Sequence, residues 1–253
     1  MKRKPRLMHN SQLTRNAWLT AARTLIIGHR GASTALPENT LAAFFLAVEQ
    51  GADGLEIDVR LSKDGRPVLV HDSTLQRLSG NPCKVCDLTV NELKQEDLGE
   101  GQTVALLEEL FDLLGDATLY NIEVKEFGLR DQGFIDRVAE EVAAFGLQSQ
   151  TLISSFNPQV VHRARRRFAS LVPVALIRGP GVYRHTNRFI NTGVENPHYS
   201  LVDEQYMARA AKRGQHTFAW TVDDIIEARR LAVLGVQGII TNEPARLRKE
   251  LAL

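Results

Sequence analysis

Short β-rich runs alternate with helical stretches along most of this 253-residue chain, and this alternation constrains the fold more than any other feature. Runs rich in β-branched and aromatic residues predict strands, and helical stretches separate most of them. Such alternation is typical of a parallel sheet with helices packed outside it. The nine runs occupy residues 24–29, 54–61, 67–72, 118–125, 151–156, 171–177, 193–198, 216–222 and 236–242.

The second and third runs are too close in sequence to be parallel neighbours. Only residues 62–66 separate them, and Asp64-Gly65 is a tight-turn sequence. A parallel crossover needs about a dozen residues or more, so the run 67–72 is expected to pair antiparallel with the run 54–61. The other eight runs suffice for one closed α/β barrel, which also suits a chain of this length.

Two segments lie outside this pattern. Residues 1–22 predict a polar N-terminal extension, either frayed or packed along a single barrel domain over residues 23–253. Residues 73–102 show no strong strand, and DLTVNELKQEDL within them predicts a short helix in an inserted loop near the active end of the barrel. Cys83 and Cys86 lie in this insertion; reduced loop thiols are favoured over a redox pair or half a zinc site, because no second pair accompanies them.

Charge and hydropathy argue against several function classes. The chain has 31 Lys and Arg against 30 Asp and Glu, so its net charge of +1 does not favour nucleic acid as a partner. No apolar run approaches the roughly 20 residues that cross a bilayer, and the basic start lacks the apolar core of a signal peptide. We therefore expect a cytoplasmic protein without a transmembrane segment. A basic stretch at residues 163–167 is expected to be a solvated helix face, with weak contact to an anionic membrane surface as the alternative.

Three carboxylates occupy positions from which strand alternation turns them to one side. Glu56 and Asp58 are two residues apart in LEIDV and share a face, and Glu123 repeats the pattern in NIEVK. Adjacent ionised acids repel, and a divalent cation relieves that repulsion. Oxygen-only ligands favour Mg²⁺ or Ca²⁺ over Zn²⁺, with Mn²⁺ as a further candidate. The alternative is that Arg30 or Lys125 neutralises the acids through salt bridges.

Two histidines stand at the ends of β-runs. His29, followed by Arg30, closes the first run, and His71 closes the run PVLVHD. Functional groups of α/β barrels lie at the C-terminal ends of strands. A histidine there exchanges protons near neutral pH, and an arginine binds phosphate bidentately, so the set suits metal-assisted cleavage of a phosphate ester. His198 ends the run 193–198 and Trp220 lies within the run 216–222; both are weaker candidates for the pocket wall.

Taken in order, these motifs resemble the glycerophosphodiester phosphodiesterase family. HRGAS, PENT, GADGLEIDVRLSKDGRPVLVHD, NIEVK, SSF, WTV and GIITNEP follow one another from about Ile26 to Pro244. HRG, EIDV and VHD at these spacings are specific, whereas SSF or WTV alone is not. The resemblance implies a TIM-type (β/α)8 barrel that hydrolyses glycerophosphodiesters to sn-glycerol 3-phosphate and an alcohol, using one divalent cation.

The resemblance also implies roles for individual residues. It makes His29 and His71 the acid–base pair, Glu56, Asp58 and Glu123 the metal ligands, and Arg30 and Lys125 the phosphate contacts. Which histidine is the acid stays open, as does the choice between water and the glycerol 2-hydroxyl as the attacking group. One departure is TVDD, where the family usually has TVN, so that Asp223 replaces an amide at the rim.

Two other functions compete with this one. A lysophospholipase D would take the same headgroup with an acyl chain attached, in an apolar groove that Trp220, Phe156 and Leu75 would build. A barrel that binds phosphoesters without turnover should have lost part of the histidine and carboxylate set, which is complete here. Headgroup preference and oligomeric state do not follow from the sequence.

Overall fold

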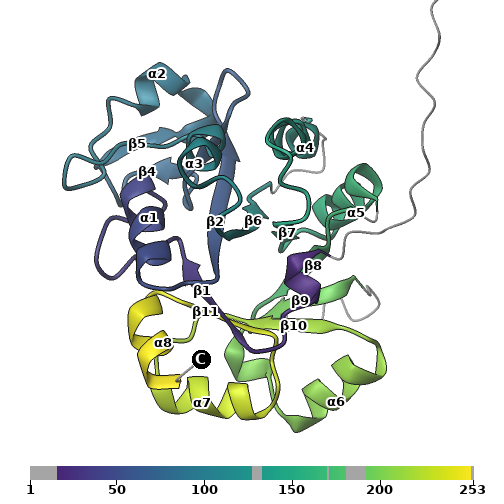
Figure 1. Ribbon diagram of the computed structural model, residues 1–253. Helices are drawn as coiled ribbons and strands as arrows, with labels where there is room; N and C mark the ends of the chain where they lie inside the picture. Colours follow the sequence, from purple (N-terminus) through teal and green to yellow (C-terminus); the bar gives the residue numbers. More distant parts are fainter. Residues whose placement is uncertain (1–15, 127–132, 170, 181–191, 252–253) are drawn as a thin grey trace, which may run out of the picture.

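Eight parallel strands close into a ring with helices outside it (Figure 1). The computed structural model describes residues 16–126, 133–169, 171–180 and 192–251. Strand β1 pairs with both β2 and β11, which closes the ring and confirms the predicted (β/α)8 barrel. The ring strands are β1 (Leu25–His29), β2 (Gly54–Leu61), β6 (Leu119–Val124), β7 (Thr151–Ser155), β8 (Val174–Arg178), β9 (Gly193–Pro197), β10 (His216–Ala219) and β11 (Gly238–Thr241).

Helices follow most of the ring strands and begin at clear capping signals. The Thr40 hydroxyl accepts a hydrogen bond from the Ala43 N–H at the start of α1, and Asn157 with Pro158 starts α5 in the same way. The helices within the described ranges are α1 (Leu41–Glu49), α2 (Val90–Leu93), α3 (Leu107–Leu114), α4 (Phe134–Ala144), α5 (Pro158–Phe168), α6 (Glu204–Lys212), α7 (Ile225–Val233) and α8 (Pro244–Leu251), with short 3₁₀ turns at Ala17–Leu19, Val85–Asp87 and Tyr199–Leu201.

Apolar side chains fill two separate layers of the barrel. The larger layer lies between the strands and the outer helices and includes Ile57, Ile122 and Phe111. A smaller cluster contains apolar residues from the opposite faces of the strands, such as Ile27, Leu152 and Phe218, and fills the barrel interior at the N-terminal ends of the strands. The polar residues described below lie above this cluster, at the C-terminal ends.

Trp18 completes the interior cluster from outside the ring. Its side chain is fully buried, its ring meets Phe218 edge-on at 5.2 Å, and its indole N–H donates to the Gln150 carbonyl at 2.7 Å. Residues 16–19 of the predicted extension are therefore packed against the bottom of the barrel. Residues 1–15 lie outside the described residues, and the boundary predicted at residue 22 stays a prediction.

The extra strand β3 (Pro67–Leu69) pairs antiparallel with β2, outside the ring, as the short Asp64-Gly65 connection predicts. It is shorter than the sequence run, so His71 lies just beyond its end. The insertion was expected to lack strands, but β4 (Thr74–Leu75) and β5 (Asn81–Lys84) form a small antiparallel sheet. That sheet is too short, and β5 too poor in β-branched residues, to give a sequence signal. The predicted short helix is α2, which a Thr89–Glu92 capping box starts.

Three further predictions concern the cysteines, membrane-spanning helices and the basic stretch. Cys83 and Cys86 are exposed and free. None of the described helices is long and apolar enough to cross a membrane. The basic stretch lies on α5, where Arg163 pairs with Glu126 and Arg167 with Asp136.

Candidate active site

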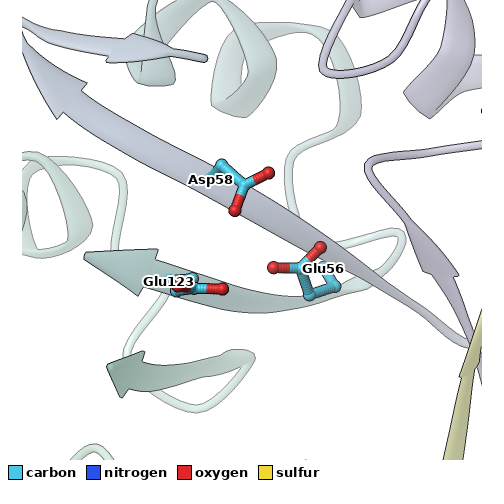
Figure 2. Close-up of side chains that lie close together, drawn as sticks. All are labelled: Glu56, Asp58 and Glu123. Carbon is cyan, nitrogen blue, oxygen red and sulfur yellow. The ribbon is translucent and has the colours of Figure 1, made fainter. Parts of the chain in front are cut away.

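Three carboxylates converge at one edge of the barrel, and strand register explains why. Asp58 on β2 is the register partner of Glu123 on β6, and Glu56 lies one alternation below Asp58 on the same face. One oxygen from each of the three side chains lies within 4.8 Å of the others (Figure 2). The residues are only 4%, 1% and 7% exposed for Glu56, Asp58 and Glu123, so water screens their mutual repulsion poorly.

Two cationic side chains, the buried Lys125 and the partly exposed Arg30, partly neutralise these acids. Arg30 Nε lies 3.0 Å from Asp58 Oδ2, and Lys125 Nζ lies 3.0 Å from Asp58 Oδ1 and 2.6 Å from Glu123 Oε1. The salt-bridge alternative therefore describes Asp58 and Glu123, but not Glu56. Glu56 Oε2 is buried without a hydrogen-bond partner among the described residues, and it lies 3.8 Å from His29 Nε2.

Burial and neighbouring charges shift the pKa values of the three acids in different directions. Burial opposes ionisation of Asp58, but the charges of Lys125 and Arg30 outweigh it and lower its pKa. Burial, reinforced by the neighbouring carboxylates, raises the pKa of Glu56 well above its ordinary value. Burial also raises the pKa of Glu123 to about 7, although Lys125 acts in the opposite direction. A bound divalent cation would offset the cost of ionising Glu56 and Glu123 in this buried site and so lower their pKa values.

The acid cluster fits a hard divalent cation. Its ligand atoms are all carboxylate oxygens, which Mg²⁺, Ca²⁺ and Mn²⁺ prefer. Three ionised carboxylates against two cationic side chains leave one negative charge in a buried site, and Glu56 Oε2 has no hydrogen bond within the described ranges.

Hydrogen bonds hold His29 in one tautomer. His29 Nδ1 lies 2.7 Å from Asn242 Oδ1, and the Asn242 amide nitrogen donates to Asp223 Oδ2 at 2.7 Å. A carboxylate only accepts, so Asp223 turns the amide oxygen of Asn242 toward the histidine. His29 Nδ1 must then carry the hydrogen, which leaves Nε2 as an acceptor facing Glu56. Burial, aided by Arg30, lowers the pKa of His29 to about 4 and keeps the imidazole neutral.

His71 has a different partner. Its Nδ1 lies 2.7 Å from Asp72 Oδ1, and its backbone carbonyl accepts two hydrogen bonds from Arg60, at 2.9 and 2.7 Å. Burial lowers the pKa of His71, while the charge of Asp58 and the hydrogen bond to Asp72 act to raise it. His71 is hydrogen-bonded to a carboxylate, which stabilises its charged form, whereas the hydrogen-bond partner of His29 is the neutral Asn242 amide.

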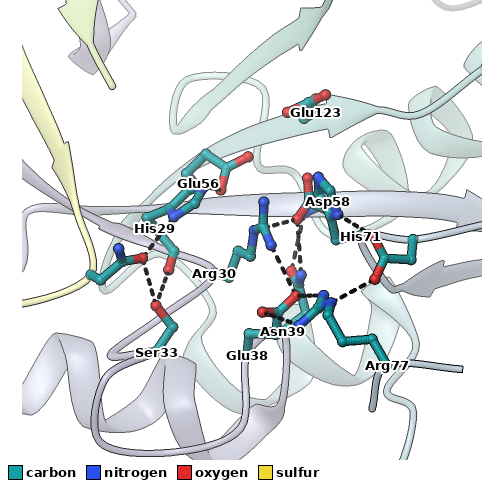
Figure 3. Close-up of polar contacts among 12 residues, drawn as sticks. His29, Arg30, Ser33, Glu38, Asn39, Glu56, Asp58, His71, Arg77 and Glu123 are labelled. Atoms are coloured by element: carbon teal, nitrogen blue, oxygen red, sulfur yellow. Dashed lines mark hydrogen bonds and ion pairs between the residues drawn. The ribbon is translucent and has the colours of Figure 1, made fainter. Parts of the chain in front are cut away.

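The turn after β1 aims Arg30 at the acids. Arg30 and Asn39 both have φ of +57°, a region that non-glycine residues seldom occupy outside functional sites. Asn39 compensates by clamping Asp58: its amide nitrogen donates to Asp58 Oδ2 at 2.9 Å, and its oxygen accepts from the Asp58 N–H at 3.1 Å (Figure 3). Glu38 accepts hydrogen bonds from both Arg30 and Arg77, and Arg77 also donates to Asp72.

A cavity of about 160 Å³ brings most of the predicted residues together. Its wall contains His29, Arg30, Glu56, His71, Glu123, Lys125 and Trp220. Asp58 lies behind this wall, held by its ion pairs. A larger hollow of about 340 Å³ lies against α6 but contains neither the acid cluster nor the two histidines.

His198 and Trp220 have different positions. Trp220 forms part of the cavity wall, meets Phe156 edge-on at 5.6 Å and donates from its indole nitrogen to the Asn196 carbonyl. His198 instead accepts a hydrogen bond from the Ser200 N–H and lies beside Trp220, outside the cavity wall. Leu75 is buried in the core of the insertion, so it does not build an acyl groove with these aromatics.

Several residues of the site were not predicted as site residues. Asn39 and Asp72 lie within the motifs PENT and VHD. Their membership of these motifs was the sequence signal that could have identified them. Asn242 and Asp223 lie in GIITNEP and TVDD, more than 190 residues after His29, and only the closed ring brings them to it. Asp223, marked as a departure from the family pattern, thus makes a specific contact to Asn242.

Comparisons with known proteins agree with this site. The model of the glycerophosphoryl diester phosphodiesterase family matches residues 29–246. The glycerophosphodiester phosphodiesterase of Caldanaerobacter subterraneus subsp. tengcongensis is 34% identical over 235 residues, which cover 89% of this chain and 96% of that protein.

Solved structures give the same result. The glycerophosphodiester phosphodiesterase of Thermotoga maritima is 30% identical with a TM-score of 0.76, covering 90% of this chain and 99% of that one. A phosphodiesterase from Oleispira antarctica, in complex with the product sn-glycerol-3-phosphate, is 26% identical with a TM-score of 0.82, covering 91% and 98%. Because the family model and these relatives span nearly the whole barrel, the chain belongs to the glycerophosphoryl diester phosphodiesterase family.

Proposed function

We propose that this protein hydrolyses glycerophosphodiesters to sn-glycerol 3-phosphate and an alcohol, with a divalent cation and two histidines of unequal roles. The observation that carries the proposal is the meeting of His29, His71 and the acid cluster Glu56, Asp58 and Glu123 at one site. The names of the relatives, and the product bound by the Oleispira antarctica enzyme, support the substrate class.

His29 is the general base in this proposal. Its Nδ1–H is held by Asn242, so its Nε2 lone pair faces the acid cluster and can take a proton from the attacking oxygen. Its lowered pKa keeps that lone pair free at neutral pH. A side chain that stays neutral in the free enzyme suits this role better than one paired with a carboxylate.

His71 is the general acid. Asp72 accepts from its Nδ1, so an imidazolium here has a fixed counter-charge, and a bound phosphodiester anion adds a second one. Its Nε2–H can then donate to the leaving alkoxide. Arg30 and Lys125 line the same cavity and would stabilise negative charge on the phosphoryl oxygens.

Glu56, Asp58 and Glu123 would hold the divalent cation. When bound, the cation polarises the phosphoryl group and lowers the pKa of a coordinated hydroxyl. The protein's own contribution is to keep the three carboxylates fixed: Asn39 and Arg30 hold Asp58, and Lys125 holds Glu123.

Turnover of glycerophosphocholine tests the reaction and the cation together. Protein treated with chelator should be inactive, and Mg²⁺, Ca²⁺ or Mn²⁺ should restore activity; lysophosphatidylcholine, assayed in parallel, tests the lysophospholipase D alternative. Activity that survives complete removal of divalent ions would refute the cation's role. Absence of hydrolysis of every glycerophosphodiester with each of the three ions would refute the proposed function and support a binding barrel.

A further inference from the structure

Arg77, in the insertion that follows β3, bridges two carboxylates near the active-site cavity (Figure 3). Its Nη1 and Nη2 groups donate to Glu38 Oε2 at 3.0 Å and Oε1 at 2.7 Å, and its Nε donates to Asp72 Oδ2 at 2.8 Å. Neither Arg77 nor these two carboxylates lines the cavity. Any effect of Arg77 on the reaction must therefore pass through residues that do line it.

The Asp72 end of this bridge leads to His71. His71 Nδ1 lies 2.7 Å from Asp72 Oδ1, and no other hydrogen bond to this imidazole occurs in the described part of the chain. The two side chains are 31% and 32% exposed, so packing alone does not fix either of them. Arg77 binds the other carboxylate oxygen of Asp72 and so restricts the rotation of that side chain.

The Glu38 end anchors the bridge. The Glu38 side chain is only 17% exposed, and Arg30 also donates to it, at 2.9 Å. The turn that carries Arg77 is held as well, because the buried Leu75 precedes it and the Ser79 N–H donates to the Leu75 carbonyl at 2.9 Å. The planar guanidinium presents several donors in a rigid fork, so three of them reach three oxygens of two carboxylates at once.

The bridge contributes little to folding but can control the orientation of His71. The Arg77 side chain is 49% exposed, and exposed ion pairs stabilise proteins only weakly because water screens the charges. The hydrogen bond at one ring nitrogen of a histidine determines what the other nitrogen can do. While Asp72 accepts from Nδ1, the ring of His71 is held with Nε2 free to act, and the imidazolium keeps its counter-charge.

We propose that Arg77 is a positioning residue: it fixes Asp72 by tying it to Glu38, and Asp72 then holds His71 ready to protonate the leaving alcohol. The inference rests on the proposed function, because it assigns a support to the general acid of that reaction. It also gives the insertion, residues 73–102, a part in the reaction. A displacement of about 1 Å at a reacting group can cost on the order of 100-fold in rate, so a support of this kind is measurable.

Turnover of glycerophosphocholine by the full-length Arg77→Met variant tests the inference. We expect kcat to fall by about 10- to 100-fold, with a melting temperature close to that of the wild type. The loss should shrink on a diester with a more acidic leaving alcohol, which needs less help from an acid. In a His71→Ala background, Arg77→Met should cost less than about twofold more, because the residue through which Arg77 acts is gone.

Two further variants sharpen the test. Arg77→Lys keeps the positive charge, but its single nitrogen cannot reproduce the fork, so it should lose nearly as much rate as Arg77→Met. Arg66→Met is the matched control: the Arg66 side chain is 43% exposed and pairs with Glu108 at 2.6 Å, and neither residue lines the cavity. It should leave kcat within about twofold of wild type.

Nitrogen-15 NMR of the His71 ring tests the positioning without turnover. The neutral imidazole should carry its hydrogen on Nδ1 in the wild type and divide between both tautomers in Arg77→Met. An unchanged tautomer there would overturn the inference.

The kinetic outcomes separate a positioning role from a structural one. Wild-type turnover in Arg77→Met or Arg77→Lys would overturn the inference, and so would losses that are independent of the leaving alcohol and simply add to that of His71→Ala. Arg77→Lys decides the matter if Arg77→Met does not fold. A wild type that hydrolyses no glycerophosphodiester, while Arg77→Met still changes the His71 tautomer, would refute the proposed function and leave the bridge as the support of His71.

Discussion

The family usually has an amide where this chain has Asp223, so Asp223→Asn tests whether this chain depends on its own carboxylate to orient Asn242 and fix the His29 tautomer. We expect the exchange to disable the base in this chain without touching any group that contacts substrate. In the native protein, Asp223 Oδ1 accepts from the Asn242 N–H and the Thr241 hydroxyl, and Oδ2 accepts from the Asn242 side-chain amide. In Asp223→Asn the side-chain oxygen at position 223 can still accept from the Asn242 N–H and the Thr241 hydroxyl. The new NH₂ group then takes the place of Oδ2 and faces the Asn242 NH₂. Two donors cannot pair, and the Asn242 amide is expected to turn over.

The turned amide would present its NH₂ to His29 Nδ1 and force the hydrogen onto Nε2. The lone pair facing the acid cluster would then be lost in the neutral enzyme. Loss of a positioned general base costs about 10²–10⁴-fold in rate, so we expect kcat to fall at least about 100-fold, equivalent to about 2.7 kcal/mol of transition-state stabilisation. KM should change little, because no substrate contact is removed.

Steady-state turnover of glycerophosphocholine measures this loss, and nitrogen-15 NMR of the His29 ring reports the tautomer directly. The double variant Asp223→Asn, Asn242→Asp places a carboxylate at position 242. That carboxylate can accept both from the new amide at position 223 and from His29 Nδ1, so the double variant should recover most of the activity. A single variant within about threefold of wild type, or a double variant no better than the single one, would refute the reasoning about the tautomer.

Three further predictions concern the site and the fold. His71→Ala should slow glycerophosphocholine turnover by about 10²–10⁴-fold, and its loss should be smaller on a diester with a more acidic leaving alcohol. His29→Ala should lose rate on both substrates. Equal losses for the two substrates in His71→Ala would contradict the assignment of His71 as the acid. Trp18→Ala should lower the free energy of unfolding by about 3–5 kcal/mol in urea titrations, with a near-wild-type value excluding its role in the core. Asp53 forms ion pairs with Arg23 and Arg248 that outweigh burial and lower its pKa, so its stabilisation is present above about pH 4 and is lost on acidification. Asp53→Asn should reduce the melting temperature at pH 7, and the difference from wild type should shrink as the pH falls below about 4.

The arrangement of the barrel was predictable from the sequence because it depends on local patterns. Two-residue alternation placed Glu56, Asp58 and Glu123 on the inner face, and a five-residue connection required β3 to run antiparallel. Both inferences need only neighbouring residues and the geometry of a strand.

Contacts between distant segments were not predictable in the same way. Whether Asn242 faces His29 depends on how the last strand joins the first, and whether Trp18 is buried depends on space left by side chains from several strands. The sequence did not predict the β4–β5 pair for another reason. Asn81-Pro82 is a poor strand sequence, and packing of Leu75 and Val85 in the insertion stabilises the pair. Tertiary packing outweighs local propensity there.

The burial of Trp18 gives this protein a pair of built-in optical probes. The chain has two tryptophans, and they stand at opposite ends of the barrel, Trp18 in the apolar cluster at the bottom and Trp220 in the wall of the active-site cavity. With either one replaced by Phe, the fluorescence of the other reports a single end. Ligand binding should then alter the emission of Trp220 alone, while opening of the barrel bottom on unfolding should shift that of Trp18 to longer wavelength.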